Sequence, residues 1–367
     1  MGDQGGPVVG VHLERSEEHG DRIDQLADRL GGRTTVAELL GDLKFTASDS
    51  WRGRMMGRAV QRAIAFDAHD QADPVWWPQG ITTSADADVT GTVAGRRVVV
   101  TTWYAKPVDG IKRGSRLTFL DLDTLRYRHV LLVDPVVDDQ GRLTLSPVKI
   151  HAGGLVWAGP WLHVAATARG FVSCHVGDLM RVADDNARPD EIGVFDEDGS
   201  SRVSSFGHHY VLPVRVAHRA FTDEGHVPLR YSFLSLDRAA NPPGLLAGEY
   251  GRGGQSTRLA QFELDLETWL PQTDESGLSR PVVHETGRVQ MQGDVVARGR
   301  HHISVSQGPV SPGAIFTGQP GRLRRHRFAT PMGPEDLTYW PATDTLWSVS
   351  EWPRRRWIYS MRRSWFD

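Results

Sequence analysis

Short apolar runs separated by turn residues dominate the chain from about residue 66 onward. Examples are residues 97–104 (RVVVTTWY), 116–122 (RLTFLDL) and 127–133 (YRHVLLV), which are rich in β-branched or aromatic side chains and bounded by Gly, Pro or Asp. Segments of this length and composition are typical of β-strands. No segment of helical periodicity interrupts them, so alternating strand–helix units and the nucleotide-binding folds built from them are disfavoured. The pattern predicts an all-β domain.

The first 65 residues follow a different pattern, with apolar side chains at helical spacing. Residues 16–29 and 34–41 predict two short helices, and a third apolar segment covers residues 55–64. Two tandem helices also occur in helix-turn-helix DNA-binding proteins, but this region is not strongly basic and has no clear recognition helix. We therefore interpret residues 1–65 as a short helical N-terminal extension that caps a main domain formed by residues 66–367.

A strand pattern recurs within this main domain. The apolar run at 98–104, a Gly-rich gap and the segment SRLTFLDLDTL at 115–125 resemble a later run at 244–250, another Gly-rich gap and the segment TRLAQFELDLETW at 257–269. Both copies contain Leu-Asp-Leu-X-Thr, which fits a third strand followed by a tight turn into a fourth. The recurrence predicts a repeat architecture.

A second pattern places Gly before an apolar run and a return strand. Its copies begin near residues 79, 151, 229, 292 and 335. A four-stranded propeller blade occupies about 40–50 residues, with insertions in its loops. We therefore predict a five-bladed β-propeller of four-stranded blades over residues 66–367. A strand at residues 63–68 would complete the last blade and cover its edge.

The last of these copies, PEDLTYWPATDTLWSVSEWPRRRWIYSM at residues 334–361, resembles known propeller blades. Strictosidine-synthase-like, gluconolactonase-like and phytase-like propellers often carry an acidic residue, a Leu-X-Tyr, a turn and then a Leu-X-X-Val-Ser-Glu strand. This resemblance implies a propeller fold and says little about activity. Five-bladed glycoside hydrolases place carboxylates at successive blade starts, because glycosidic cleavage needs two acids. Gln79 and His151 stand at the first two starts, which disfavours that class.

Charge and composition exclude several classes of partner. The net charge is -3, with 42 basic and 45 acidic residues, so the chain has no electrostatic footprint for nucleic acid or an anionic membrane. No stretch of 18 apolar residues predicts a membrane span, and no signal-peptide pattern opens the chain, so we expect a cytoplasmic protein. Cys174, the single cysteine, forms no intramolecular disulfide and is predicted to be a buried strand residue. Only four of the 42 basic residues are lysines, a bias that resembles coding in a GC-rich bacterium.

Polar residues at the blade starts are the candidates for chemistry, because the innermost strand of each propeller blade lines the central channel. We predict catalytic roles for His151 as a base, for Glu335 as an acid or metal ligand, and for Asp336. Converging imidazole and carboxylate groups could bind a divalent metal. They could equally perform acid–base chemistry, or bond one another in a filled channel. The sequence therefore leaves the cofactor open, with none required and a divalent metal possible.

A second set of residues is predicted to contact the ligand. Trp76 and Trp77 precede the first blade start and Trp340 lies in the last blade, so in a closed ring they would form an aromatic wall suited to an apolar or planar ligand. The set of predicted substrate-binding residues is Gln79, Trp76, Trp77, His209, Gln292 and Trp340. Inter-blade packing is the structural alternative for the tryptophans.

These observations predict a bacterial propeller enzyme that acts on a small organic molecule at the mouth of the central channel. The expected chemistry is a non-redox cyclisation, lyase or hydrolysis step, by acid–base or metal-assisted catalysis, with secondary metabolism as its setting. The alternative is a non-catalytic propeller that binds a protein or glycan. The sequence does not predict the oligomeric state.

Overall fold

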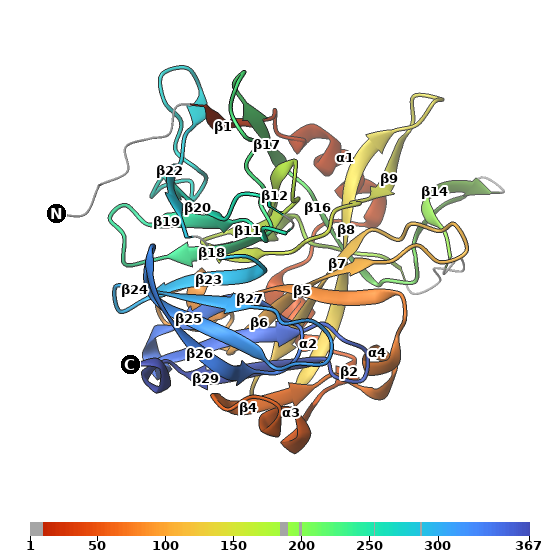
Figure 1. The fold of residues 1–367 in the computed structure, drawn as a ribbon. Helices are drawn as coiled ribbons and strands as arrows, with labels where there is room; N and C mark the ends of the chain where they lie inside the picture. Colours follow the sequence, from red (N-terminus) through yellow and green to blue (C-terminus); the bar gives the residue numbers. More distant parts are fainter. Residues whose placement is uncertain (1–9, 184–189, 198–199, 253, 287) are drawn as a thin grey trace.

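The computed structural model describes residues 10–183, 190–197, 200–252, 254–286 and 288–367. Over these residues the strands form five sheets of four to eight strands and one separate hairpin of β14 (Ile192–Glu197) and β15 (Ser200–Ser205) (Figure 1). The all-β prediction is confirmed for the main domain.

Each of the five sheets is built around four antiparallel strands. The first of these strands lies nearest the centre of the molecule and the fourth lies farthest from it. In the first sheet these are β5 (Trp76–Thr83), β6 (Val98–Ala105), β7 (Ser115–Asp121) and β8 (Arg126–Val137). In the second they are β10 (Leu155–Ala158), β11 (Trp161–Ala165), β12 (Gly170–His175) and β17 (Val216–Thr222). In the third they are β18 (Phe233–Asp237), β19 (Gly244–Gly248), β20 (Arg258–Glu263) and β22 (Val282–Glu285).

The last two sheets follow the same plan. The fourth contains β23 (Met291–Ala297), β24 (Arg300–Val305), β25 (Gly313–Gln319) and β26 (Arg322–Thr330). The fifth contains β27 (Pro334–Trp340), β28 (Thr345–Ser350), β29 (Trp357–Arg362) and β4 (Val60–Ala65). Short strands extend some sheets at their outer edges: β1 (Val11–Arg15), β2 (Phe45–Thr46), β3 (Ser48–Asp49), β9 (Leu143–Pro147), β13 (Met180–Arg181), β16 (Tyr210–Pro213) and β21 (Leu278–Ser279).

The first strands of these sheets meet around the centre of a β-propeller arrangement. β5 contacts β10, β10 contacts β18, β18 contacts β23, β23 contacts β27, and β27 contacts β5. Glycines permit this close approach. A Cβ atom on Gly80 would lie 2.7 Å from the carbonyl carbon of Gly154, and one on Gly293 would lie 2.5 Å from the amide nitrogen of Leu337. The glycine that precedes the apolar runs in the sequence is therefore required where neighbouring innermost strands touch.

The fifth sheet takes its fourth strand from the N-terminal part of the chain. β4 pairs antiparallel with β29, so that Ala63 lies opposite Tyr359. This confirms the predicted closure, although the strand covers Val60–Ala65 rather than residues 63–68. The edge of β29 is thereby covered.

The N-terminal region contains the two predicted helices, α1 (Gly20–Leu30) and α2 (Val36–Gly41). α2 begins with a capping box, in which the Thr35 hydroxyl accepts a hydrogen bond from the Glu38 amide and the Glu38 carboxylate accepts one from the Thr35 amide. The region also supplies β1 to β4, which pair with the sheets of the main domain. A purely helical description of this region is therefore incomplete, and the domain boundary at residue 65 stays a prediction.

Three further short helices, α3 (Trp51–Met55), α4 (Ala68–Ala72) and α5 (Ser84–Ala87), join the strands. α5 directly follows β5 and contacts β5, β10 and β27. It therefore covers the end of the central strands at which β5 finishes. Across the described part of the chain, no helix is long and apolar enough to cross a membrane.

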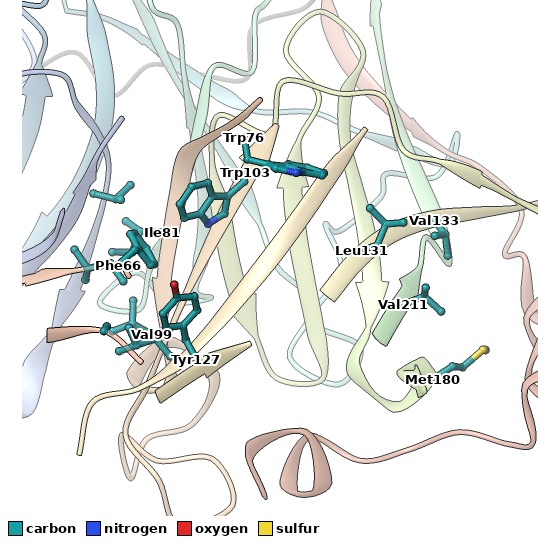
Figure 2. Close-up of a cluster of buried hydrophobic side chains, with 14 of the residues drawn as sticks. Phe66, Trp76, Ile81, Val99, Trp103, Tyr127, Leu131, Val133, Met180 and Val211 are labelled. Atoms are coloured by element: carbon teal, nitrogen blue, oxygen red, sulfur yellow. The ribbon is translucent and has the colours of Figure 1, made fainter. Parts of the chain in front are cut away.

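Aromatic side chains fill the space between the first and fifth sheets. Eight of the 12 tryptophans are buried. Trp76 and Trp103 of the first sheet lie in one apolar cluster (Figure 2). Trp340 and Trp347 of the fifth sheet belong to the same cluster. The indole N–H groups of Trp103 and Trp347 donate hydrogen bonds of 3.0 Å to threonine hydroxyls two residues earlier. Packing between neighbouring sheets thus accounts for these tryptophans.

Candidate functional site

A polar cavity of about 350 Å³ lies at the end of the propeller where the innermost strands begin. Four of the predicted site residues line it: Gln79, His151, Gln292 and Glu335. The other lining residues are Thr167, Arg230, Ser232, Tyr250, Arg252, Gln255 and Glu351. Every lining residue carries a polar or charged group, so the cavity suits a polar ligand rather than an apolar one.

β-Bulges turn three of these side chains toward the cavity. The pairing register shifts between Pro78 and Ile81 in β5, between Met291 and Gly293 in β23, and between Pro334 and Leu337 in β27. Gln79, Gln292 and Glu335 lie within these irregular segments. A bulge interrupts the alternation of a strand and redirects a side chain, which explains how equivalent positions of three sheets converge.

Two glutamate–glutamine pairs form one side of the cavity. The Gln292 side-chain amide donates a hydrogen bond of 3.1 Å to Glu335 Oε1. The Gln79 amide donates one of 3.2 Å to Glu351 Oε2 and another of 2.9 Å to the carbonyl of Pro78. The two amides therefore hold the two carboxyl groups in fixed positions.

Burial controls the protonation of these two carboxyl groups. Glu335 is 2% exposed, and desolvation, reinforced by the nearby Glu351 and Asp336, raises its pKa well above the usual value. Desolvation also raises the pKa of Glu351, but the Gln79 hydrogen bond and the Lys106 and Arg356 charges oppose this shift. Of these two carboxyl groups, Glu335 thus favours its neutral form more strongly.

His151 faces the same cavity from the second sheet and stacks on Tyr104, with the ring centroids 4.4 Å apart. Although the His151 side chain is exposed, partial desolvation by the side chains around it, together with the positive charge of Lys106, lowers the pKa of its imidazole. Its imidazole is therefore neutral at neutral pH and retains a nitrogen that can accept a proton. Desolvation, with the Glu351 and Glu335 charges, raises the pKa of Tyr104 to about 12, so this phenol stays protonated.

Asp336, predicted to be catalytic, is fully buried and is not among the residues that line the cavity. Its Oδ2 accepts hydrogen bonds from the amides of Ile81 (3.3 Å) and Leu155 (3.0 Å), and its Oδ1 accepts one from the Leu337 amide (3.0 Å). One carboxyl group thus links β27 to β5 and β10. Desolvation raises its pKa well above the usual value, against the lowering effect of these three donors.

None of the three tryptophans of the predicted aromatic wall lines this cavity. Trp77 packs against Trp352, and the ammonium group of Lys106 lies 3.2 Å from the centroid of the Trp77 ring. Trp340 packs against Trp347 in the core between the sheets. The tryptophans fill wedges between sheets instead of facing the channel.

Trp76 and His209 belong to a different cavity, of about 280 Å³, on the first sheet. There the Arg116 guanidinium lies 4.5 Å from the Trp76 ring centroid and donates a hydrogen bond of 2.8 Å to Asp70. Four of the six predicted substrate-binding residues are therefore divided between two separate cavities, and Trp77 and Trp340 line neither of them.

Sequence reasoning missed Glu351 and the residues of the third sheet that line the main cavity. Glu351 ends the Val-Ser-Glu strand that supports the resemblance to known propeller blades, so a signal for it was present. Arg230 and Ser232 flank the buried Tyr231, close to the predicted third blade start at residue 229. The sequence around the third blade start matches the repeat only loosely, so these residues were not recognised as site residues.

Cys174 is buried on β12, as predicted, and desolvation raises the pKa of its thiol well above the usual value. This environment disfavours the nucleophilic thiolate. Within the residues that the structure describes, no group of three or more His, Cys, Asp or Glu side chains is placed to hold a metal ion.

No protein-family model and no curated protein sequence matches the chain. Similar solved structures include a gluconolactonase from Xanthomonas campestris, with 12% identity, coverage of 88% of this chain and 85% of that chain, and a TM-score of 0.35. The β-propeller domain of Cps50 (Swd1) from Myceliophteria thermophila has 8% identity, coverage of 77% and 96%, and a TM-score of 0.36. A GH43_1 enzyme from Xanthomonas citri, complexed with xylose, has 10% identity, coverage of 79% and 88%, and a TM-score of 0.32.

Proposed function

We propose that this protein is a five-bladed propeller enzyme that acts on a small polar organic molecule in the cavity at the start of the innermost strands. The ring of contacts from β5 through β10, β18, β23 and β27 back to β5 supports the count of five blades. The reaction is a non-redox cleavage with Glu335 as general acid and His151 as general base.

The observation that carries this proposal is the opposite protonation preference of two groups that line one cavity. Burial favours the neutral acid at Glu335, which can then donate a proton to a leaving oxygen. Desolvation and Lys106 favour the neutral imidazole at His151, which can then accept a proton from water or substrate. Pairs of titratable groups whose environments drive their pKa values in the directions needed for catalysis are typical of active sites.

The polar lining narrows the reaction class. A cyclisation of an apolar or polycyclic compound would need apolar walls, whereas this cavity offers amides, hydroxyls and charges. Hydrolysis is favoured, because the Gln79 and Gln292 amides hold Glu351 and Glu335 in place within this polar cavity. Gln292 fixes the orientation of the acid, and burial, reinforced by the nearby Glu351, raises the pKa of Glu335.

Kinetics on purified protein test this proposal. A chromogenic panel of esters, lactones and glycosides identifies a hydrolysed compound, and its turnover is then measured for the wild type, Glu335→Gln and His151→Ala. Loss of one general acid or base costs about 10²–10⁴-fold in rate, so we expect both variants to lose at least about 100-fold in kcat. Glu263→Gln, an exposed change on β20, is the matched control and should retain full activity. Full activity in both site variants would refute the assignment.

A further inference from the structure

The segments before β18 and between β19 and β20 give the main cavity a positively charged wall. Arg230 and Arg252 both line the cavity, and both side chains are exposed. Within the described part of the chain, the two residues form hydrogen bonds through their backbone groups, and neither guanidinium group has an ion-pair partner. Two guanidinium groups without counter-charges therefore border a polar cavity.

The carboxylate nearest in sequence does not neutralise this wall. Glu249 is 1% exposed and is saturated by Arg258, whose Nη2 and Nε donate hydrogen bonds of 2.9 and 3.0 Å to its two oxygens. Glu249 Oε1 also accepts a hydrogen bond of 3.1 Å from the backbone amide of Arg230. The buried Glu249–Arg258 pair thus fixes the backbone that carries Arg230 and leaves its side-chain charge uncompensated.

Arg252 is held in a similar way, because its backbone amide donates a hydrogen bond of 3.2 Å to the side chain of Gln255. Gln255 lines the cavity as well. Backbone restraint of both arginines fixes where their side chains leave the chain, so ordering on binding is limited to the side chains themselves.

The acidic side of the cavity does not supply the missing counter-charge. Burial favours the neutral form of Glu335. Glu351 interacts with two cations of its own, Lys106 and Arg356. An anionic group from a ligand would therefore restore the charge balance next to Arg230 and Arg252.

We infer that Arg230 and Arg252 bind a carboxylate group of the substrate, so that the protein selects organic acids over neutral molecules of the same shape. Arginine presents its N–H donors in a planar fork that matches a carboxylate, and two such groups give a charge-assisted site. The remainder of the substrate then extends toward Gln292 and Glu335, where amide and hydroxyl groups offer hydrogen bonds. This inference rests on the proposed function only in taking the cavity as the substrate site.

Calorimetric titration of the full chain with matched pairs of compounds tests the inference. The probes are lactate, mandelate and glucuronate, each compared with its primary amide, which keeps the shape and removes the charge. We expect at least one acid to bind at least tenfold more tightly than its amide. In the Arg230→Gln/Arg252→Gln double variant this preference should disappear, while Arg322→Gln, an exposed arginine change on β26, should leave it unchanged. Circular dichroism checks that all variants are folded.

Three results would overturn the inference: no acid binds, the amides bind as tightly as the acids, or the double variant keeps the preference. Glu335→Gln separates this inference from the proposed reaction. If that variant keeps both acid selectivity and full turnover, the acid–base assignment fails and carboxylate recognition stands. If it loses turnover while the wild type shows no acid preference, the catalytic role stands and carboxylate recognition fails.

Discussion

The Asp336 carboxyl group offers the sharpest test of how the innermost strands are joined. It accepts three backbone N–H bonds of 3.0–3.3 Å at a position with no exposure to solvent. A buried donor left without a partner costs about 1–3 kcal/mol, so Asp336→Ala should lose at least about 3 kcal/mol in the free energy of unfolding. Asp336→Asn keeps one acceptor oxygen, which can serve Ile81 and Leu155, and loses only the Leu337 bond. It should therefore cost about 1–3 kcal/mol.

Urea unfolding followed by tryptophan fluorescence measures both losses. Amide hydrogen exchange shows where they arise, because the Ile81 and Leu155 amides should lose protection in Asp336→Ala. The control is Asp265→Ala, whose carboxylate accepts bonds from the Glu267 and Thr268 amides in a partly exposed turn where water can replace it. If Asp336→Ala unfolds at the wild-type urea concentration and both amides stay protected, the carboxyl group does not join these strands. Turnover of Asp336→Asn at the pH optimum provides a second reading, since a residue that only joins strands leaves kcat at that pH near the wild-type value.

Four further predictions follow from the same geometry. Glu335→Gln should stabilise the fold relative to the wild type, and increasingly so as pH rises. The neutral Glu335 carboxyl group contributes to the wild-type free energy of unfolding, because its pKa is raised in the folded protein. This contribution is complete below the pKa of the unfolded chain, about 4.5, and is lost as pH rises toward the pKa of the folded protein. Urea titrations at acid and alkaline pH check this, and an equal effect at both would contradict it. Activity should follow a bell-shaped pH profile. Its acid limb should lie below pH 6.5, because the pKa of His151 is lowered, and its alkaline limb should disappear in a Glu335 variant. Gly293→Ala should destabilise by about 1–3 kcal/mol, because its Cβ would collide with β27; thermal unfolding measures this, and an unchanged midpoint would refute the close approach. Ala63→Pro should break the pairing of β4 with β29 and lower the midpoint in the same assay, whereas an unaffected midpoint would argue against closure by β4.

Strand positions were predictable because each strand carries its own local signal. The β-branched runs that became β6, β7 and β8 lie within a few residues of the predicted segments. The Gly-containing repeat was informative for a physical reason, since Gly80 and Gly293 stand where two backbones touch. Such a constraint acts on one residue and is visible without knowledge of the partner strand.

The packing of the tryptophans could not be predicted from the sequence, because their environment depends on sheets that lie far apart in the sequence. Trp77 was expected beside the channel, yet its neighbours are Trp352 and Lys106. The pleat fixes which side of a strand a residue faces, but the bulge at Gln79 changes this side within β5. A one-residue irregularity that cannot be recognised in the sequence therefore determines which of the neighbouring side chains enters the cavity.

A second bulge, in β27, explains why Glu335 and Asp336, adjacent in sequence, have different surroundings. The β27 bulge allows Asp336 to reach the amides of β5 and β10, while Glu335 turns toward Gln292 and the cavity. Because the Asp336 hydrogen bonds fix the position of β27 against two neighbouring strands, they also fix the position of the Glu335 carboxyl group beside its hydrogen-bond donor. Glu335 stays buried only while those strands remain joined, and burial is the main cause of its raised pKa. Asp336→Asn should consequently lower the pKa of Glu335 if the joint loosens. The alkaline limb of the activity profile would then move to lower pH, even though Asp336 does not line the cavity.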